Sequence, residues 1–137
     1  MTPPFRHRIR VRYSECDLQG VVFNANYLTF LDEAITELFR TALDGGYQAM
    51  VAAGVDMVVA ESNLRFLAPA RFDDQVEVQA TVTRLGTTAM TTAMAITRDG
   101  EVLTEAELRH VFVRSPEGGK APIPDSVRAA LEPFTRG

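Results

Sequence analysis

The chain has 137 residues, of which 46% are hydrophobic and 23% charged, the balance of a folded domain with its own core. The net charge of -4 argues against nucleic acid as the main partner, because phosphate binding needs clustered Lys and Arg. Cys16 is the single cysteine, which excludes an intrachain disulfide and a multi-cysteine zinc site. The sequence shows no signal peptide and no apolar run near the ~20 residues of a membrane span, so a cytoplasmic location is expected.

The first predicted elements are a strand over residues 5–13 and a long helix over residues 24–43. In the strand, apolar residues alternate with arginines. In the helix, apolar residues recur at spacings of three and four from Tyr27 to Ala42, which gives one apolar stripe. Asn24 or Asn26 is expected to cap the start of the helix, and Gly45-Gly46 to stop it.

Most of the remaining chain is predicted to form strands, over residues 56–67, 76–83, 87–98 and 102–114. Asp99-Gly100 is a hairpin signal, so the last three strands should form an antiparallel meander. Residues 124–131 fit a short terminal helix. The single long helix must bury its stripe against the sheet, which predicts a two-layer α+β domain. Exposed sheet edges favour the pairing of two copies of the chain.

Residues 13–27, which join the first strand to the helix, carry the most chemical information. Asp17 places a carboxylate on this loop, and Gly20 allows the backbone to turn tightly. The first turn of the helix presents free N–H groups and a partial positive charge. A carboxylate beside such donors suits acyl transfer: the donors stabilise an oxyanion, and the carboxylate attacks or activates water.

At these residues the sequence resembles the 4-hydroxybenzoyl-CoA thioesterase-like branch of the hotdog superfamily. The first motif comprises Tyr13, Asp17, Gly20, Val21-Val22 and Asn26-Tyr27. The second is Pro69-Ala70-Arg71-Phe72-Asp73-Asp74, before the central meander. The resemblance covers roughly residues 5–115. It implies a single hotdog domain over residues 1–137, with residues 116–137 as a C-terminal extension and one long central helix wrapped by a curved antiparallel sheet.

The resemblance also implies a function, the hydrolysis of an acyl-CoA thioester to a free acid and CoA. Asp17 would be the nucleophile or general base, and the backbone N–H near Asn24, with Gly20, would polarise the thioester carbonyl. CoA would enter as part of the substrate, with no metal or redox cofactor. The protein would be a homodimer or homotetramer with its active site at the dimer interface. The residues expected to contact substrate or CoA are Tyr27, Arg71, Arg84, Thr87 and Thr88.

Several residues compete with Asp17 for a catalytic role. Glu33 and Glu37 lie on the predicted helix, where some hotdog thioesterases keep their carboxylate. Glu33 should face solvent or a subunit contact, whereas Glu37 lies nearer the edge of the stripe. Glu15 is expected to be solvated, and Cys16 to be a small buried packing residue.

The two histidines, His7 and His110, help to compare alternative functions. His110 alternates with Leu108 and Phe112, which favours packing or an interface contact, and Met90 and Met94 are expected in the core. A hotdog hydratase or dehydratase would carry a histidine in the loop or helix region, where this chain has none. That alternative and a catalytically silent acyl-CoA-binding subunit both stay open. The identity of the acyl group also stays open, as does the choice between a covalent anhydride with Asp17 and a water that Asp17 activates.

Overall fold

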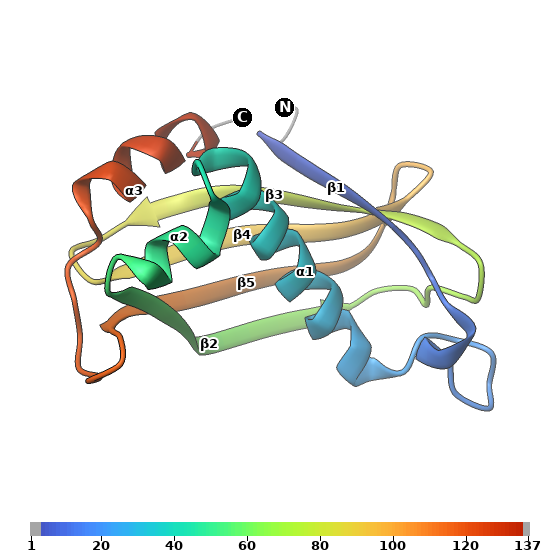
Figure 1. Ribbon diagram of the computed structural model, residues 1–137. Coiled ribbons are helices and arrows are strands. Elements are labelled where there is room, and N and C mark those ends of the chain that lie inside the picture. The colour runs from blue at the N-terminus through green and yellow to red at the C-terminus, as the bar shows by residue number, and fades with distance from the viewer. Residues whose placement is uncertain (1–3, 136–137) are drawn as a thin grey trace.

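A five-stranded antiparallel sheet, crossed on one face by a long helix, forms the body of the protein (Figure 1). The computed structural model describes residues 4–135. The strands lie in the order β1-β3-β4-β5-β2, so β3, β4 and β5 form the predicted meander. The elements are β1 (Phe5–Arg10), α1 (Asn24–Ala42), α2 (Gly46–Ala52), β2 (Val55–Phe66), β3 (Gln75–Leu85), β4 (Ala89–Arg98), β5 (Glu101–Arg114) and α3 (Asp125–Leu131), with 3-10 turns at Tyr13–Glu15 and Glu132–Phe134.

Helix α1 is held against the sheet by the apolar stripe that the sequence predicts. Its seven buried residues are Tyr27, Phe30, Leu31, Ala34, Ile35, Leu38 and Phe39. They share one core with the inward-facing residues of the strands, such as Val76 and Val78 on β3. Met90 and Met94 lie in the same core, as predicted. Because a helix packs against one face of a curved antiparallel sheet, the predicted α+β hotdog fold is confirmed.

The β4–β5 hairpin turns at Asp99 and Gly100, which have φ angles of 51° and 83°. Two successive positive φ angles are the mark of a type I′ hairpin turn, whose twist matches that of the strands it joins. The local Asp-Gly signal therefore predicted this connection correctly.

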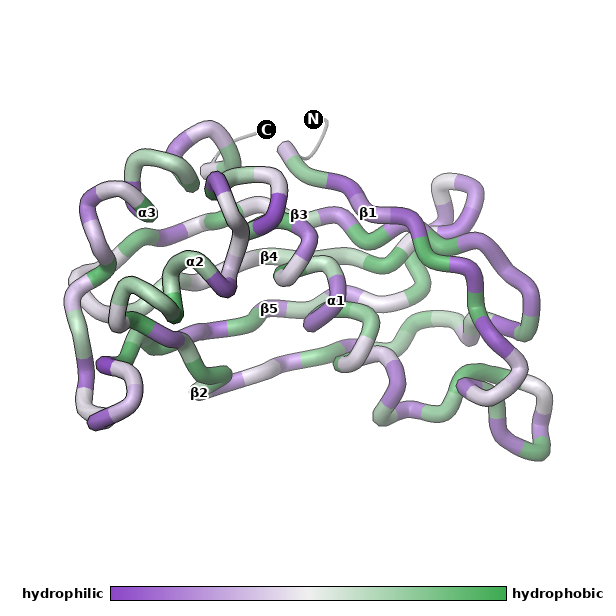
Figure 2. The backbone as a smooth tube through the Cα atoms, viewed as in Figure 1, coloured by the Kyte–Doolittle hydropathy of each residue, from purple (hydrophilic) through white to green (hydrophobic). Residues whose placement is uncertain are grey.

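The two edge strands of the sheet differ in length and character. At one edge, β1 has 6 residues and carries three arginines, and it is mainly hydrophilic in Figure 2. At the other edge, β2 has 12 residues, and its apolar side chains Val58, Val59 and Phe66 are exposed. Charged side chains and short length discourage pairing at a sheet edge, so β2 is the edge suited to pairing.

Two predictions about local structure are wrong. The first strand ends at Arg10 instead of Tyr13, because residues 13–15 form a 3-10 turn. Neither Asn24 nor Asn26 caps α1 through its side chain; Phe23 occupies the N-cap position. The predicted stop at Gly45-Gly46 is confirmed, since α1 ends at Ala42. Gly45, with φ of 81°, also precedes α2, a helix that the sequence did not predict.

Within residues 4–135, no helix combines the length and the apolar character needed to cross a membrane.

Candidate active site

Asp17 lies in a tight turn whose backbone is fixed by three hydrogen bonds. The Asp17 N–H donates to the Val21 carbonyl at 2.9 Å, and the Gly20 N–H donates to the Asp17 carbonyl at 3.0 Å. The Gln19 N–H donates to Asp17 Oδ1 at 2.8 Å. Gly20 has φ of 78°, a conformation that glycine adopts without strain. In the part of the chain that the structure describes, Asp17 Oδ2 has no hydrogen-bond partner, so it is available to a substrate or water.

The Asp17 turn forms one wall of a pocket of about 470 Å³. Tyr13 and Phe72 line the same pocket, and their rings meet edge to face with centroids 5.9 Å apart. Both rings are exposed, as is Leu18 at the tip of the turn. The exposed carboxylate thus lies in a crevice with apolar walls.

The loop that carries Asp17 is tied directly to the start of α1. The Glu15 carbonyl oxygen accepts two hydrogen bonds, from the Phe23 N–H and from Asn26 Nδ2, each at 2.9 Å. Among residues 4–135, the N–H groups of Asn24 and Ala25 have no hydrogen-bond partner. These are the free donors expected at a helix N-terminus, and their joint action with Asp17 stays a prediction.

Glu15 is not the solvated side chain that was expected, since it is 8% exposed. Glu15 Oε1 accepts the Arg12 backbone N–H at 2.7 Å, and Oε2 accepts the Arg12 guanidinium at 3.0 Å. Burying a carboxylate requires such partners, and here they close the 3-10 turn before Asp17. The spacing of Arg12 and Glu15 was the only sequence signal for this contact.

Cys16 is half-buried and packs against the edge of the core, in partial agreement with the expected packing role. Partial burial, together with the nearby carboxylates of Glu15 and Asp17, raises the pKa of the Cys16 thiol. The thiolate is the reactive form of cysteine, so these surroundings favour the unreactive thiol.

The two sequence motifs meet in space beside the Asp17 turn. The Val22 N–H donates to the Ala70 carbonyl at 2.8 Å, and Val21 pairs with Arg71 in an isolated bridge. Tyr27 is buried, and its hydroxyl accepts the Ala70 N–H at 3.0 Å. Tyr27 therefore has a structural role within the protomer, and its contact with substrate stays a prediction, as does that of the exposed Arg71.

The turn that contains Arg71 is fixed by Asp74 and Arg98. Asp74 Oδ2 accepts the Arg71 N–H at 2.8 Å and Arg98 Nη1 at 2.7 Å. Burial alone would raise the pKa of Asp74, but these two hydrogen bonds outweigh it, and the pKa is lowered. An ionised Asp74 thus holds this turn against the Asp17 loop.

Arg84, Thr87 and Thr88 line a second pocket, of about 290 Å³, together with Arg109 and Thr91. Arg109 was missed because it joins Arg84 only through β4, where Thr91 pairs with both. This pocket lies at the opposite end of the sheet from Asp17 (Figure 1). β3 runs between the two ends from Gln75 to Leu85, a length of roughly 33 Å at ~3.3 Å per residue.

The predicted site residues therefore fall into two separate groups within one protomer. Asp17 and Gly20 share a pocket, with Asn24, Tyr27 and Arg71 next to that loop. Arg84, Thr87 and Thr88 form the other group.

Comparison with known proteins identifies the family. The model of the thioesterase-like superfamily matches residues 11–131. The chain belongs to this thioesterase-like superfamily. It is 34% identical over 132 residues to the acyl-CoA thioester hydrolase YbgC of Escherichia coli O157:H7, covering 96% of this chain and 98% of the relative. It is also 26% identical to a 1,4-dihydroxy-2-naphthoyl-CoA hydrolase of Thermosynechococcus vestitus, covering 96% of this chain and 90% of that protein.

Solved structures agree with the fold. A protein of Aquifex aeolicus superposes with a TM-score of 0.89 at 27% identity, covering 94% of this chain and all of that one. The predicted resemblance to hotdog thioesterases is therefore confirmed.

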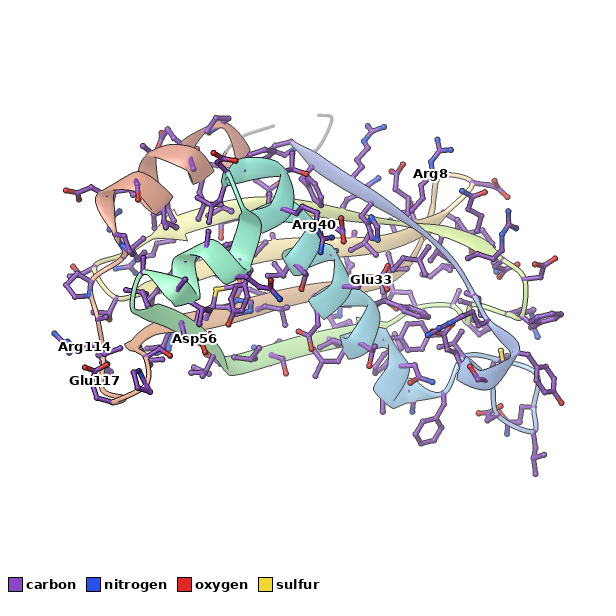
Figure 3. The ribbon with its side chains drawn as sticks, in the orientation of Figure 1. Arg8, Glu33, Arg40, Asp56, Arg114 and Glu117 are labelled. Atoms are coloured by element: carbon purple, nitrogen blue, oxygen red, sulfur yellow. The ribbon has the colours of Figure 1, made fainter. Side chains whose placement is uncertain are left out.

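The carboxylates that compete with Asp17 in this thioesterase-like chain are already paired. Glu33 is exposed on α1, as predicted (Figure 3). Its Oε2 lies 2.7 Å from His7 Nε2. Glu37 pairs with Arg40 one helical turn later. Neither residue lines the Asp17 pocket.

Proposed function

We propose that this protein is an acyl-CoA thioesterase that hydrolyses a CoA thioester to a free acid and CoA, with Asp17 as its catalytic carboxylate. The observation that carries the proposal is the tie between Glu15 and the start of α1. It fastens a loop with a free carboxylate oxygen to a helix terminus with two free N–H groups. The relation to YbgC over nearly the whole chain supports the same activity.

The chemistry requires two roles at one thioester carbonyl. The Asn24 and Ala25 N–H groups, aided by the positive end of α1, would stabilise the negative charge that develops on the carbonyl oxygen. Asp17 Oδ2 would either attack the carbonyl carbon or take a proton from the attacking water. If Asp17 attacks, the C–S bond breaks to leave a mixed anhydride, which one water then hydrolyses to the free acid and the Asp17 carboxylate. If Asp17 acts as a base, the water itself displaces the thiolate. In both cases the thiolate takes up a proton and one water is consumed. CoA takes part only as a portion of the substrate, and no other cofactor is needed.

The complete site would form between two protomers. Arg84, Thr87 and Arg109 offer charged and hydroxyl donors that suit CoA phosphates, but they lie at the end of the sheet remote from Asp17. Pairing of β2 with β2 of a second copy would be antiparallel, so each end of one sheet would lie beside the opposite end of the other. One protomer would then supply Asp17 and its partner the CoA-binding group, within a homodimer or a homotetramer built from such dimers.

The exposed residues of β2 support this mode of association. Val58 and Val59 are 49% and 42% exposed, on a strand whose outer edge has no partner among residues 4–135. A long strand of this kind is a template for pairing, and closed two-fold pairing removes the exposed edge. Light scattering on the purified protein would measure the assembly; a monomer at micromolar concentration would contradict it. The cytoplasmic location expected from the sequence belongs to the same proposal.

Asp17→Asn tests the catalytic assignment. We expect kcat for CoA release from acyl-CoA thioesters to fall by at least ~10²-fold with little change in KM, because the carboxylate acts mainly in the transition state. Glu37→Gln is the matched control and should keep nearly normal kcat. Loss of activity in the Glu37 variant alone would move the catalytic role to α1.

The same assay separates the alternative functions. A hydratase or dehydratase would change the acyl chain of the thioester without releasing thiol. A silent binding subunit would bind acyl-CoA and release nothing. Release of free CoA that depends on Asp17 is expected only for the thioesterase.

A further inference from the structure

A separate pocket of about 240 Å³ lies between α1, α2 and the two strands at the β2 edge. Its lining includes Ile35 and Thr36 of α1, Met57 and Val59 of β2, and His110 of β5. Asp32 and Tyr47 complete the lining. A cavity of about 150 Å³ can hold benzene, so this pocket can hold an aromatic ring or a short branched chain with room for a substituent.

His110 is the unusual member of this lining. It is 3% exposed, and its Nδ1 is buried without a hydrogen-bond partner among residues 4–135. Its neighbours on the same strand face, Leu108 and Phe112, are fully buried apolar residues. Nδ1 is enclosed by protein, whereas Nε2 is not enclosed and also has no hydrogen-bond partner in the described chain. Because His110 lines the pocket, Nε2 is the nitrogen with which a ligand there can complete a hydrogen bond.

The other hydroxyl groups around the pocket are already engaged. The Thr36 hydroxyl donates to the Asp32 carbonyl at 3.1 Å. The Tyr47 hydroxyl donates to the Asp56 carboxylate, which lies at the start of β2 (Figure 3). His110 is therefore the buried side chain here that is free to bind a ligand.

The surroundings also define the kind of ligand. Burial lowers the pKa of His110 to about 4, so its imidazole is neutral near pH 7 and offers one donor and one acceptor nitrogen. The carboxylate of Asp32, which also lines the pocket, would repel an anionic group. Ile35, Met57 and Val59 favour an apolar body. These features fit an uncharged group that carries a hydroxyl or carbonyl oxygen.

The position of the pocket relates it to the proposed thioesterase site. Phe66, at the C-terminal end of β2, contacts the Tyr27 ring at 5.2 Å between centroids, next to the Asp17 loop. Met57 and Val59 lie toward the N-terminal end of the same strand. In an antiparallel β2–β2 pair, the N-terminal end of β2 in one protomer would lie beside the C-terminal end of β2 in its partner. The pocket of one protomer would therefore lie near the Asp17 loop of the other.

We propose that this pocket receives the far end of the acyl group, and that His110 selects acyl groups whose far end carries an uncharged hydroxyl or carbonyl oxygen. The inference rests on the proposed thioesterase activity and adds a specificity-determining residue to it. His110 acts on substrate choice and takes no part in breaking the C–S bond.

The test compares two thioesters that differ by one hydroxyl, para-hydroxyphenylacetyl-CoA and phenylacetyl-CoA. We expect kcat/KM for the hydroxylated thioester to exceed that for the other by about 10-fold, the ratio that one hydrogen bond typically provides. His110→Leu should abolish this preference while the unhydroxylated thioester is still hydrolysed. His110→Gln, which keeps a donor and an acceptor, should retain part of it.

Thr104→Val is the matched control, because Thr104 also has a buried hydroxyl without a partner in the described chain but does not line the pocket. It should leave the ratio unchanged. Equal constants for the two thioesters in the wild type, or an unchanged ratio in His110→Leu, would overturn the role of His110. Failure to release CoA from any thioester would instead contradict the proposed function.

Discussion

The side chain of Asn26 donates to the backbone carbonyl of Glu15 at 2.9 Å, across eleven residues of sequence. This bond, together with the one from the Phe23 N–H to the same carbonyl, joins the Asp17 loop to the first turn of α1. The Asn26 side chain thus joins the start of α1 to the Glu15 backbone but does not cap the helix. The relative position of the carboxylate and the free N–H groups depends on this contact.

Asn26→Ala should weaken both stability and catalysis. Loss of one partly buried hydrogen bond is expected to lower the free energy of unfolding by about 1 kcal/mol, and Tm by roughly 3–5 °C. Because the Asp17 loop would move relative to α1, kcat should fall while KM changes less. Calorimetry and steady-state kinetics would measure these effects. Asn24→Ala is the control, since the Asn24 side chain makes no hydrogen bond in the described structure. Equal losses of stability and kcat in both variants would contradict the role of the Asn26–Glu15 hydrogen bond.

His110 should make stability depend on pH. Burial lowers the pKa of His110 to about 4 in the folded protein, whereas an unfolded histidine has a pKa of about 6.5. As pH falls from about 6.5 toward 4, the unfolded chain takes up a proton that the folded chain does not, so stability is lost on acidification. The loss should approach about 3 kcal/mol near pH 4.

Urea unfolding of the wild type and His110→Leu at a series of pH values would measure this loss. The free energy of unfolding of His110→Leu should rise relative to that of the wild type as pH falls from 7 to 4, because only the wild type carries the titrating histidine. A difference that stays constant across this range would show that His110 is not held neutral by burial.

The pocket of Arg84 and Arg109 should act on CoA binding. Replacing both arginines by alanine is expected to raise KM for acyl-CoA by at least about 10-fold with a small change in kcat, since charged hydrogen bonds to phosphate contribute mainly to binding. The effect should be larger for acyl-CoA than for an acyl-pantetheine thioester, which lacks the nucleotide. Arg8→Ala, an arginine on β1 (Figure 3), is the control and should leave KM unchanged.

Local patterns in the sequence were sufficient for the main elements. The spacing of Phe30, Leu31 and Ala34 predicts α1 because a helix repeats every 3.6 residues, and the alternation of Val76 and Val78 predicts β3. Asp99-Gly100 predicts its hairpin because both residues tolerate positive φ. Helix α2 was not predicted because it starts at Gly46, where a pair of glycines normally marks the end of a helix.

Features that depend on contacts between distant segments of the chain could not be predicted from local sequence patterns. The burial of Glu15 follows from its contacts with Arg12 and with the start of α1. Arg109 joins Arg84 only because β4 lies between β3 and β5. The pocket around His110 exists because β2 returns to the outer side of β5, next to α1, and no short-range pattern records that return.

Mixing two variants, one impaired in catalysis and one in CoA binding, tests directly whether Asp17 of one protomer works with the CoA-binding pocket of its partner. Asp17→Asn and the Arg84→Ala, Arg109→Ala double variant would be co-refolded or co-expressed in equal amounts, and CoA release measured at subsaturating acyl-CoA. If each site is shared between protomers, half of the dimers are mixed and each has one intact site, so activity should recover to about one quarter of the wild-type value. Activity no higher than the mean of the two separate variants would show that Asp17 and the arginines act within the same protomer, or in different sites.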